Sequence, residues 1–125
     1  MHIPQFSILY VANPVHSARF YRELFQRAPV EECPSFAMFV FESGAKLALW
    51  AREQVEPAVT QEAGAMELAF PLPDDACIDA CFAKWQADGL TIAQRPTRME
   101  FGYTCVALDP DGHRLRLYSP APELA

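Results

Sequence analysis

The sequence has few of the residues that nucleic-acid-binding and membrane-spanning proteins need. Of its 125 residues only 10 are Lys or Arg, against 16 Asp or Glu, so the net charge is −6. Because nucleic-acid phosphates require a basic protein face, this balance argues against a nucleic-acid partner. No apolar run approaches the ~20 residues that a membrane span requires. We therefore expect neither nucleic acid nor membrane as a partner.

Several motifs that carry chemistry are also missing. The sequence has no glycine-rich phosphate loop, no Walker motif and no nucleophile elbow of a Ser-His-Asp triad. Its four cysteines form no Cys-x-x-Cys pair. Residues 1–5 lack the basic region followed by an apolar stretch that is typical of a secretory signal. We expect reduced thiols and a cytoplasmic location.

The residues that are present suit a globular protein. Hydrophobic residues make up 51% of the chain and charged residues 21%. This composition is typical of a folded chain with a real core, and the length is that of one ordinary domain, residues 1–125.

One unit of sequence occurs twice. Residues 6–13 lead into a helical stretch, and residues 67–74 lead into another with apolar residues at the same offsets. A second correspondence pairs residues 44–50 with residues 112–118. Two copies predict a pseudo-twofold arrangement with a pocket where the copies meet.

Each copy has the pattern of one helix among four strands. Asn13 before Pro14 is typical of a helix start, and Asp74 or Asp75 is expected to cap the second helix. Gly89 is expected to end that helix in a left-handed conformation. The expected strands are residues 6–12, 30–33, 36–41 and 46–51, then 66–72, 91–95, 103–108 and 114–118.

These elements predict an α+β fold of two βαβββ modules in tandem. The first module is residues 5–52 and the second is residues 65–119, with residues 53–64 as a linker. We expect the two modules to form a pseudo-twofold curved mixed sheet around a central cavity.

Short motifs at residues 9–11, 17–22, 101–102 and 109–113 match a known family. Together they resemble the vicinal oxygen chelate superfamily, also called the glyoxalase/bleomycin-resistance/dioxygenase superfamily. The resemblance extends from Phe6 to Tyr118. It implies the fold but leaves the activity open, because this superfamily includes lyases, isomerases, dioxygenases and drug binders without catalysis.

Within the superfamily the chain resembles most the phenazine-antibiotic resistance proteins. The residues that carry this likeness lie at 9–13, 20–21, 47–50 and 101–113. The resemblance implies a metal-free homodimer that sequesters an aromatic drug. It also implies that Trp50, which matches a Trp of those proteins, contacts the ligand.

The resemblance further implies where a metal would bind. Enzymes of the superfamily hold a divalent metal with a His or Gln in the first strand of each module and a Glu in the last strand. The matching positions here are Phe6, Glu67, Ala48 and Arg116. Phe6 and Ala48 have no ligating atom, Arg116 is a permanent cation, and one carboxylate is not a site. We expect no metal, no cofactor and no catalytic residue.

Glu67 and Arg116 are then candidates for an ion pair. If the repeat brings both to one cavity, they should pair across the position that a metal would occupy. The alternative is that Arg116 projects from a short strand into solvent.

Strand alternation predicts which other side chains line the pocket. Phe6, Ile8 and Tyr10 share one face of the first strand, and Trp50 and Tyr118 are equivalent aromatic ends in the two modules. Such walls, together with the Glu67–Arg116 pair, suit a flat and partly polar ligand that stacks on rings.

Some of these residues have simpler interpretations. Trp50 is expected to contact the ligand, but an aromatic residue at a strand end also often fills a core. Met99 and Phe101 are expected to close over the mouth of the pocket. Dimer contacts or an ordinary loop position are the alternatives for these two residues.

Three functions remain open on the sequence. The first is a metal-free binding protein that sequesters a small planar aromatic compound, as in phenazine resistance. The second is a superfamily enzyme of lyase, isomerase or dioxygenase type with an atypical or lost metal site. The third is a domain whose surface, rather than a cavity, carries the function.

Overall fold

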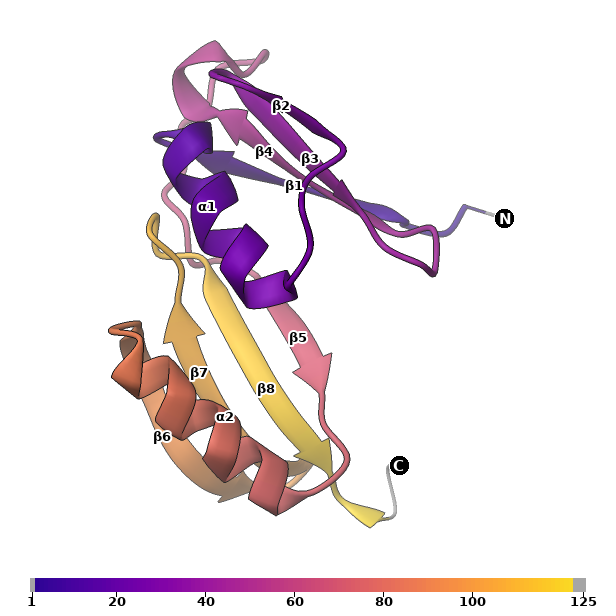
Figure 1. Cartoon of the computed structure of the whole chain (residues 1–125), viewed down its shortest axis with the longest axis vertical. Helices are drawn as coiled ribbons and strands as arrows, with labels where there is room; N and C mark the ends of the chain where they lie inside the picture. The colour runs from indigo at the N-terminus through magenta and orange to yellow at the C-terminus, as the bar shows by residue number, and fades with distance from the viewer. Residues whose placement is uncertain (1, 123–125) are drawn as a thin grey trace. The chain divides into compact units, whose positions relative to one another are not determined.

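The computed structural model describes residues 2–122, and the chain divides into two compact units, Met1–Gln61 and Glu62–Ala125. The division falls within the segment expected to link the two copies. Figure 1 labels the elements, which are β1 Phe6–Val11, α1 Pro14–Phe25, β2 Glu31–Cys33, β3 Phe36–Val40, β4 Lys46–Ala51, the 3-10 helix η1 Arg52–Gln54, β5 Glu67–Pro71, α2 Asp75–Ala87, β6 Thr91–Met99, β7 Gly102–Leu108 and β8 Arg114–Pro120.

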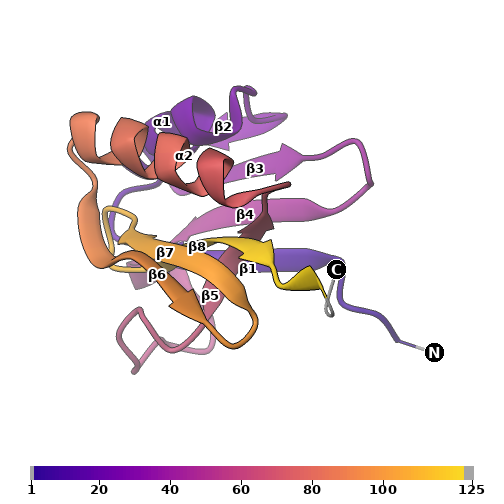
Figure 2. The same ribbon diagram turned by 90° about the horizontal axis from the view of Figure 1, so that it is seen from below.

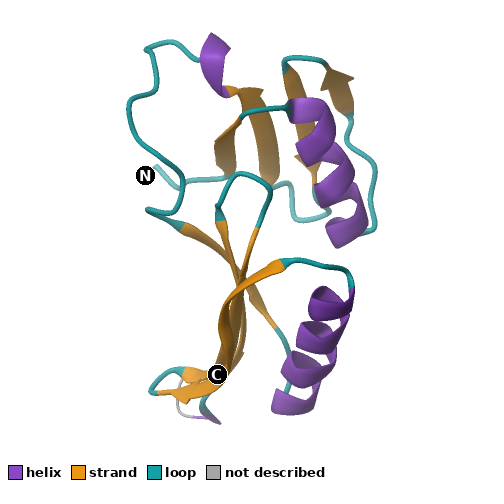
Figure 3. Ribbon diagram, turned by 90° about the vertical axis from the view of Figure 1, so that its left-hand side faces the viewer, coloured by secondary structure: helices purple, strands orange, loops and turns teal. Residues whose placement is uncertain are grey.

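Module one consists of a four-stranded sheet and one helix. Its strand order is β1-β4-β3-β2, with β1 parallel to β4 and the other pairs antiparallel. Helix α1 lies against one face of this sheet (Figure 3). The core lies between sheet and helix, and it includes Leu9, Val11, Phe39 and Leu49 of the sheet and Tyr21 of α1, each at most 3% exposed.

Helix α1 begins where the sequence predicts. Asn13 is the N-cap, and its Oδ1 accepts hydrogen bonds from the backbone N–H groups of Val15 at 3.1 Å and His16 at 3.2 Å. Pro14 occupies the first turn, where no N–H is needed. The helix ends at Phe25, and Gln26 takes the left-handed conformation that stops it.

Module two repeats the topology of module one. Its order is β5-β8-β7-β6, again with the first two strands parallel (Figure 2). The register also repeats: Tyr10 pairs with Trp50 in module one, as Pro71 pairs with Tyr118 in module two. The α+β fold of two tandem βαβββ modules is therefore confirmed.

Helix α2 also follows its predicted signals. Asp74 is the N-cap, with its Oδ1 accepting from the Cys77 N–H at 2.9 Å. Gly89 follows the C-cap Asp88 with φ +84°, and its N–H donates to the Gln86 carbonyl at 3.1 Å. The predicted left-handed end is confirmed.

The predicted end of β6 at residue 95 is wrong, because the strand extends to Met99. Pro96 suggested an end, since proline has no N–H for a ladder. The strand is nevertheless at the sheet edge, and its register with β7 shifts between Gln94 and Thr97, so the ladder needs no donor at Pro96.

The cysteines and the helices can be compared with what the composition predicts. All four cysteines are free thiols. Within residues 2–122 no helix combines the length and apolar character needed to cross a membrane.

Candidate functional site

The sheet of module one has a face opposite α1, and the predicted aromatic residues lie on it. Phe6, Ile8 and Tyr10 alternate along β1 with the side chains that face α1, and they are 43%, 43% and 39% exposed. Large apolar side chains so accessible along one strand are unusual outside binding surfaces. We call this the helix-free face of module one.

Trp50 lies on the same helix-free face. Its register partner on β1 is Tyr10, and the two rings meet edge to face with centroids 6.3 Å apart and an interplanar angle of 75°. The half-buried Phe36 and Met38 of β3 share this face. Trp50 is itself half-buried and is not part of the core beneath α1.

In module two the predicted Glu67–Arg116 ion pair is confirmed. The Arg116 Nε donates to Glu67 Oε1 at 2.7 Å, and the two side chains are 17% and 35% exposed. Arg116 pairs in register with Ala69 and Val106, which places it on the sheet face opposite α2. The alternative that Arg116 projects into solvent is wrong.

Further polar contacts fix the guanidinium of Arg116. Its Nη1 donates to Gln94 Oε1 at 3.2 Å and to Thr104 Oγ1 at 3.1 Å. Thr104 is fully buried, and its hydroxyl donates in turn to the Leu117 carbonyl at 2.7 Å. A guanidinium held at three points is preorganised, so it loses little further freedom when it meets an acceptor.

The remaining predicted residues of module two lie close to this network. The Phe101 ring centroid is 5.7 Å from the Arg116 guanidinium carbon. Met99 is 43% exposed, and its sulfur accepts a hydrogen bond from Gln94 Nε2 at 3.4 Å. Tyr118 is half-buried on β8, two residues from Arg116 and on the same face. Closure of Met99 and Phe101 over a ligand stays a prediction.

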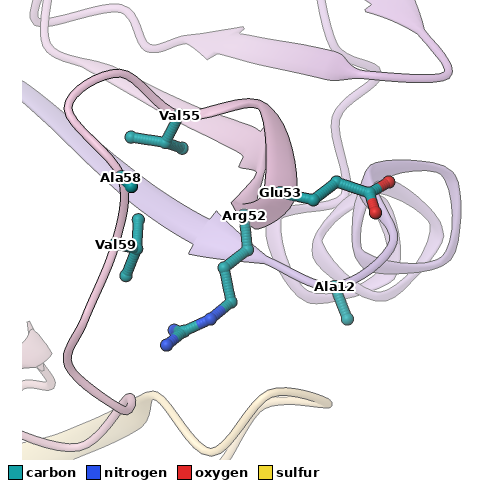
Figure 4. A pocket seen from close by; sticks show the side chains of 6 residues that line it. All are labelled: Ala12, Arg52, Glu53, Val55, Ala58 and Val59. Carbon is teal, nitrogen blue, oxygen red and sulfur yellow. The ribbon is translucent and has the colours of Figure 1, made fainter.

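A surface cleft of about 380 Å³ lies at the carboxyl ends of the parallel strands β1 and β4. Figure 4 shows its lining residues, which are Ala12, Arg52, Glu53, Val55, Ala58 and Val59. The sequence pattern did not predict this cleft, because residues 53–64 were expected to be only a linker. The sequence feature that could have indicated the cleft is Arg52, which comes two positions after Trp50 where that strand continues.

A family model described as the Glyoxalase/Bleomycin resistance protein/Dioxygenase superfamily matches residues 2–117. The chain belongs to that superfamily. The match spans both modules, in agreement with the resemblance seen in the sequence.

Individual relatives support the same assignment. The chain is 30% identical over 117 residues to the phenazine antibiotic resistance protein EhpR of Enterobacter agglomerans, covering 91% of this chain and 89% of that protein. A solution NMR structure of an Agrobacterium tumefaciens protein has 50% identity and a TM-score of 0.89, covering 97% of this chain and 99% of that one. A glyoxalase-related enzyme from Fulvimarina pelagi has 27% identity and a TM-score of 0.81, covering 95% and 88%.

The residues at the superfamily's metal positions do not suit a metal. Phe6 and Ala48 offer no donor atom, and Ala48 is fully buried. In module two the carboxylate of Glu67 accepts from the cation Arg116, which would repel a metal ion. Across residues 2–122, no group of three or more His, Cys, Asp or Glu side chains is arranged to hold one.

Proposed function

We propose that this protein binds and sequesters a small planar aromatic compound of the phenazine type, without a metal. The observation that carries the proposal is the accessible row of aromatic and aliphatic side chains on the helix-free face of module one. Phe6, Ile8 and Tyr10 occupy alternate positions of β1, with Trp50 edge-on to Tyr10. Flat ligands gain contact area on such rings, and stacking geometry adds about 0.5–1.5 kcal/mol.

We propose a second ligand contact within module two, at the polar network around Arg116. The hydrogen bonds of Arg116 use its Nε and Nη1, and within residues 2–122 its Nη2 makes none. A ring nitrogen, a carbonyl or a carboxylate of a ligand is a suitable acceptor for that donor. The proposal thus assigns ligand contacts to Glu67, Arg116, Tyr118, Met99 and Phe101.

Two further facts support sequestration rather than chemistry. The relative named for phenazine antibiotic resistance matches 91% of the chain. The positions at which superfamily enzymes hold their metal carry Phe6, Ala48 and an ion pair between Glu67 and Arg116. Sequestration requires only affinity and sufficient protein, so it is compatible with these residues.

An enzymatic function is the second candidate. The observation in its favour is the 27% identity to a glyoxalase-related enzyme of Fulvimarina pelagi over 95% of the chain. On this view the chain acts on a small oxygenated substrate with an atypical or lost metal site. The two candidate functions differ in whether the protein releases the bound compound chemically unchanged.

Recovery of the compound after binding separates these functions. The protein is mixed with a limiting amount of phenazine, passed over a gel-filtration column, and the protein peak is extracted and analysed by chromatography and mass. Sequestration predicts that the compound elutes with the protein and is recovered intact. A modified compound, formed in amounts exceeding the protein, would establish the enzymatic alternative.

We also propose that the protein acts as a homodimer with no nucleic-acid or membrane partner. The basis is the resemblance to dimeric resistance proteins and the net charge of −6. Sedimentation equilibrium at micromolar concentration tests the assembly, with an expected mass of twice 14.0 kDa. A monomer mass across the concentration range would contradict it.

A further inference from the structure

Lys46 is a cation at one end of the helix-free face of module one. It shares a face of β4 with Trp50, because alternate residues of a strand lie on the same side. Its register partners are Phe6 on β1 and Val40 on β3, and the next residue of β4 on this face is Ala48. All three neighbours are apolar, so Lys46 adds a positive charge to the edge of an apolar surface.

The ammonium of Lys46 is accessible and is held beside a ring. The side chain is exposed, and its Nζ lies 5.7 Å from the centroid of the Phe6 ring. This contact with the ring satisfies none of the three N–H donors of the ammonium. Within residues 2–122, Lys46 makes no ion pair, although the chain has 16 acidic residues. Its donors are therefore open to an acceptor that reaches this end of the face.

The acidic side chains closest to Lys46 in the fold do not neutralise it. The Glu42 carboxylate pairs with Arg27 at 3.6 Å. Glu31 shares the helix-free face through its register with Met38, but β3 lies between its strand and β4. Two strand spacings separate β2 from β4 by about 10 Å, which exceeds the Debye length of about 8 Å at physiological ionic strength. An anion beside Lys46 thus meets a local positive charge.

The distance between the two ends of the face suits an extended ring system. Lys46 and Trp50 are four residues apart on β4, which corresponds to about 13 Å between their Cα atoms. The accessible Ile8 lies between them, in register with Ala48. Three fused rings with a short substituent can lie over Ile8 and reach toward both ends.

We infer that Lys46 anchors the carboxylate of a planar aromatic acid whose rings lie along Phe6, Ile8 and Tyr10. This inference rests on the proposed function and narrows its ligand class. An ammonium and a carboxylate form a charge-assisted hydrogen bond, which is stronger than one to a neutral acceptor. With a net charge of −6 the protein as a whole repels anions, so a preference for an acid requires a local cation.

The test compares two probes, phenazine-1-carboxylic acid and phenazine-1-carboxamide. They have the same ring system, and only the acid is charged at pH 7, since carboxylic acids have pKa values near ~4. Dissociation constants are measured by calorimetry at low and at high NaCl concentration. The pair with Lys46 predicts that the acid binds at least about fivefold tighter than the amide at low salt, and that salt weakens only the acid.

Three variants locate the source of that preference. Lys46→Gln is expected to reduce the preference to within about twofold, whereas Lys46→Arg keeps the charge and is expected to retain most of it. Arg19→Gln removes one positive charge from the exposed surface of α1, on the other side of the sheet, and is expected to leave the preference intact. Thermal melts confirm that each variant is folded.

The outcomes separate this inference from the proposed function. Equal affinity for acid and amide in the natural protein, or a preference that survives Lys46→Gln, would overturn the anchor while leaving aromatic binding in place. An equal loss of the preference in Arg19→Gln would also overturn it, because the effect would then come from net charge alone. Failure of both probes to bind would refute the proposed function, and the anchor with it.

Discussion

Arg116 differs from the arginines of the surface ion pairs in how little of its side chain reaches water. It is 17% exposed, whereas Arg22, which pairs with Glu32, is 45% exposed. Burial strengthens a pair but makes the loss of one partner more costly, because the remaining charge stays away from water. The two arginines therefore offer a matched comparison within one protein.

Replacing Arg116 by Met should lower the free energy of unfolding by about 2 kcal/mol, because Glu67, Gln94 and Thr104 each lose a donor. Arg22→Met removes a surface pair and should cost less than about 1 kcal/mol. Urea unfolding measures the loss of stability in each variant, by the shift of the unfolding midpoint at an unchanged m value. Equal losses in the two variants would show that the Arg116 network does not stabilise module two.

At the scale of the strand and turn, Gly102 allows β7 and β8 to approach each other closely. Its φ is +147°, and a Cβ at this position would lie 2.0 Å from the Ser119 carbonyl oxygen. The Ser119 oxygen belongs to the backbone, and a Cβ is fixed directly to the backbone, so neither atom can move without shifting a strand. The Phe101-Gly102 motif seen in the sequence thus has a steric basis.

Gly102→Ala should lower stability by about 2 kcal/mol or more, through overpacking and backbone strain. The matched control is Gly89→Ala, at φ +84°, where a Cβ would meet nothing within 4 Å. That change should cost about 1 kcal/mol from the left-handed backbone alone. If the two substitutions are equally tolerated, the close approach is not rigid.

The start of α2 should be sensitive to acid. The pKa of Asp75 is lowered from its ordinary value of 3.8, first by the hydrogen bond from the Ser119 hydroxyl at 2.5 Å and then by Arg98. The pKa of Asp74 is also lowered, through the bond from the Cys77 N–H. A carboxyl with a lower pKa in the folded state contributes stability above its unfolded pKa, and loses it as the pH falls through the folded pKa.

We therefore expect stability to fall as the pH drops below about 4, and this fall to be shallower in Asp75→Asn and in Ser119→Ala. Thermal melts between pH 2 and pH 6 measure the slope in each protein. Unchanged slopes in both variants would contradict the assigned cause.

Helix ends were predictable because their signals are local. Asn13 and Asp74 bond to N–H groups only two or three residues away, so their roles follow from neighbours in sequence. The end of β6 was not predictable in this way, because Pro96 is tolerated only through the edge position of the strand. That position depends on sheet order, which local patterns do not contain.

The same limit applies to the candidate site. The repeat paired Glu67 with Phe6 and Arg116 with Ala48, and so predicted the ion pair. Gln94 and Thr104 were missed because they reach Arg116 only through the register of β6, β7 and β8. The cleft at the ends of β1 and β4 was missed because Val55, Ala58 and Val59, which line it, come from a segment without regular periodicity.

At the scale of the whole molecule, the proposed function requires that the helix-free face of module one bind flat ligands. The chain has two tryptophans, and they lie in different environments. Trp85 is 4% exposed on α2 in module two, while Trp50 is half-buried on the helix-free face. Replacing Trp85 by Phe leaves Trp50 as the sole indole reporter of that face.

The most direct measurement is a fluorescence titration of the Trp85→Phe protein with phenazine. The account predicts saturable quenching of Trp50, and at least about tenfold weaker binding in a Trp50→Ala protein measured by calorimetry. Quenching that never saturates, or the same calorimetric affinity with and without Trp50, would contradict the central claim.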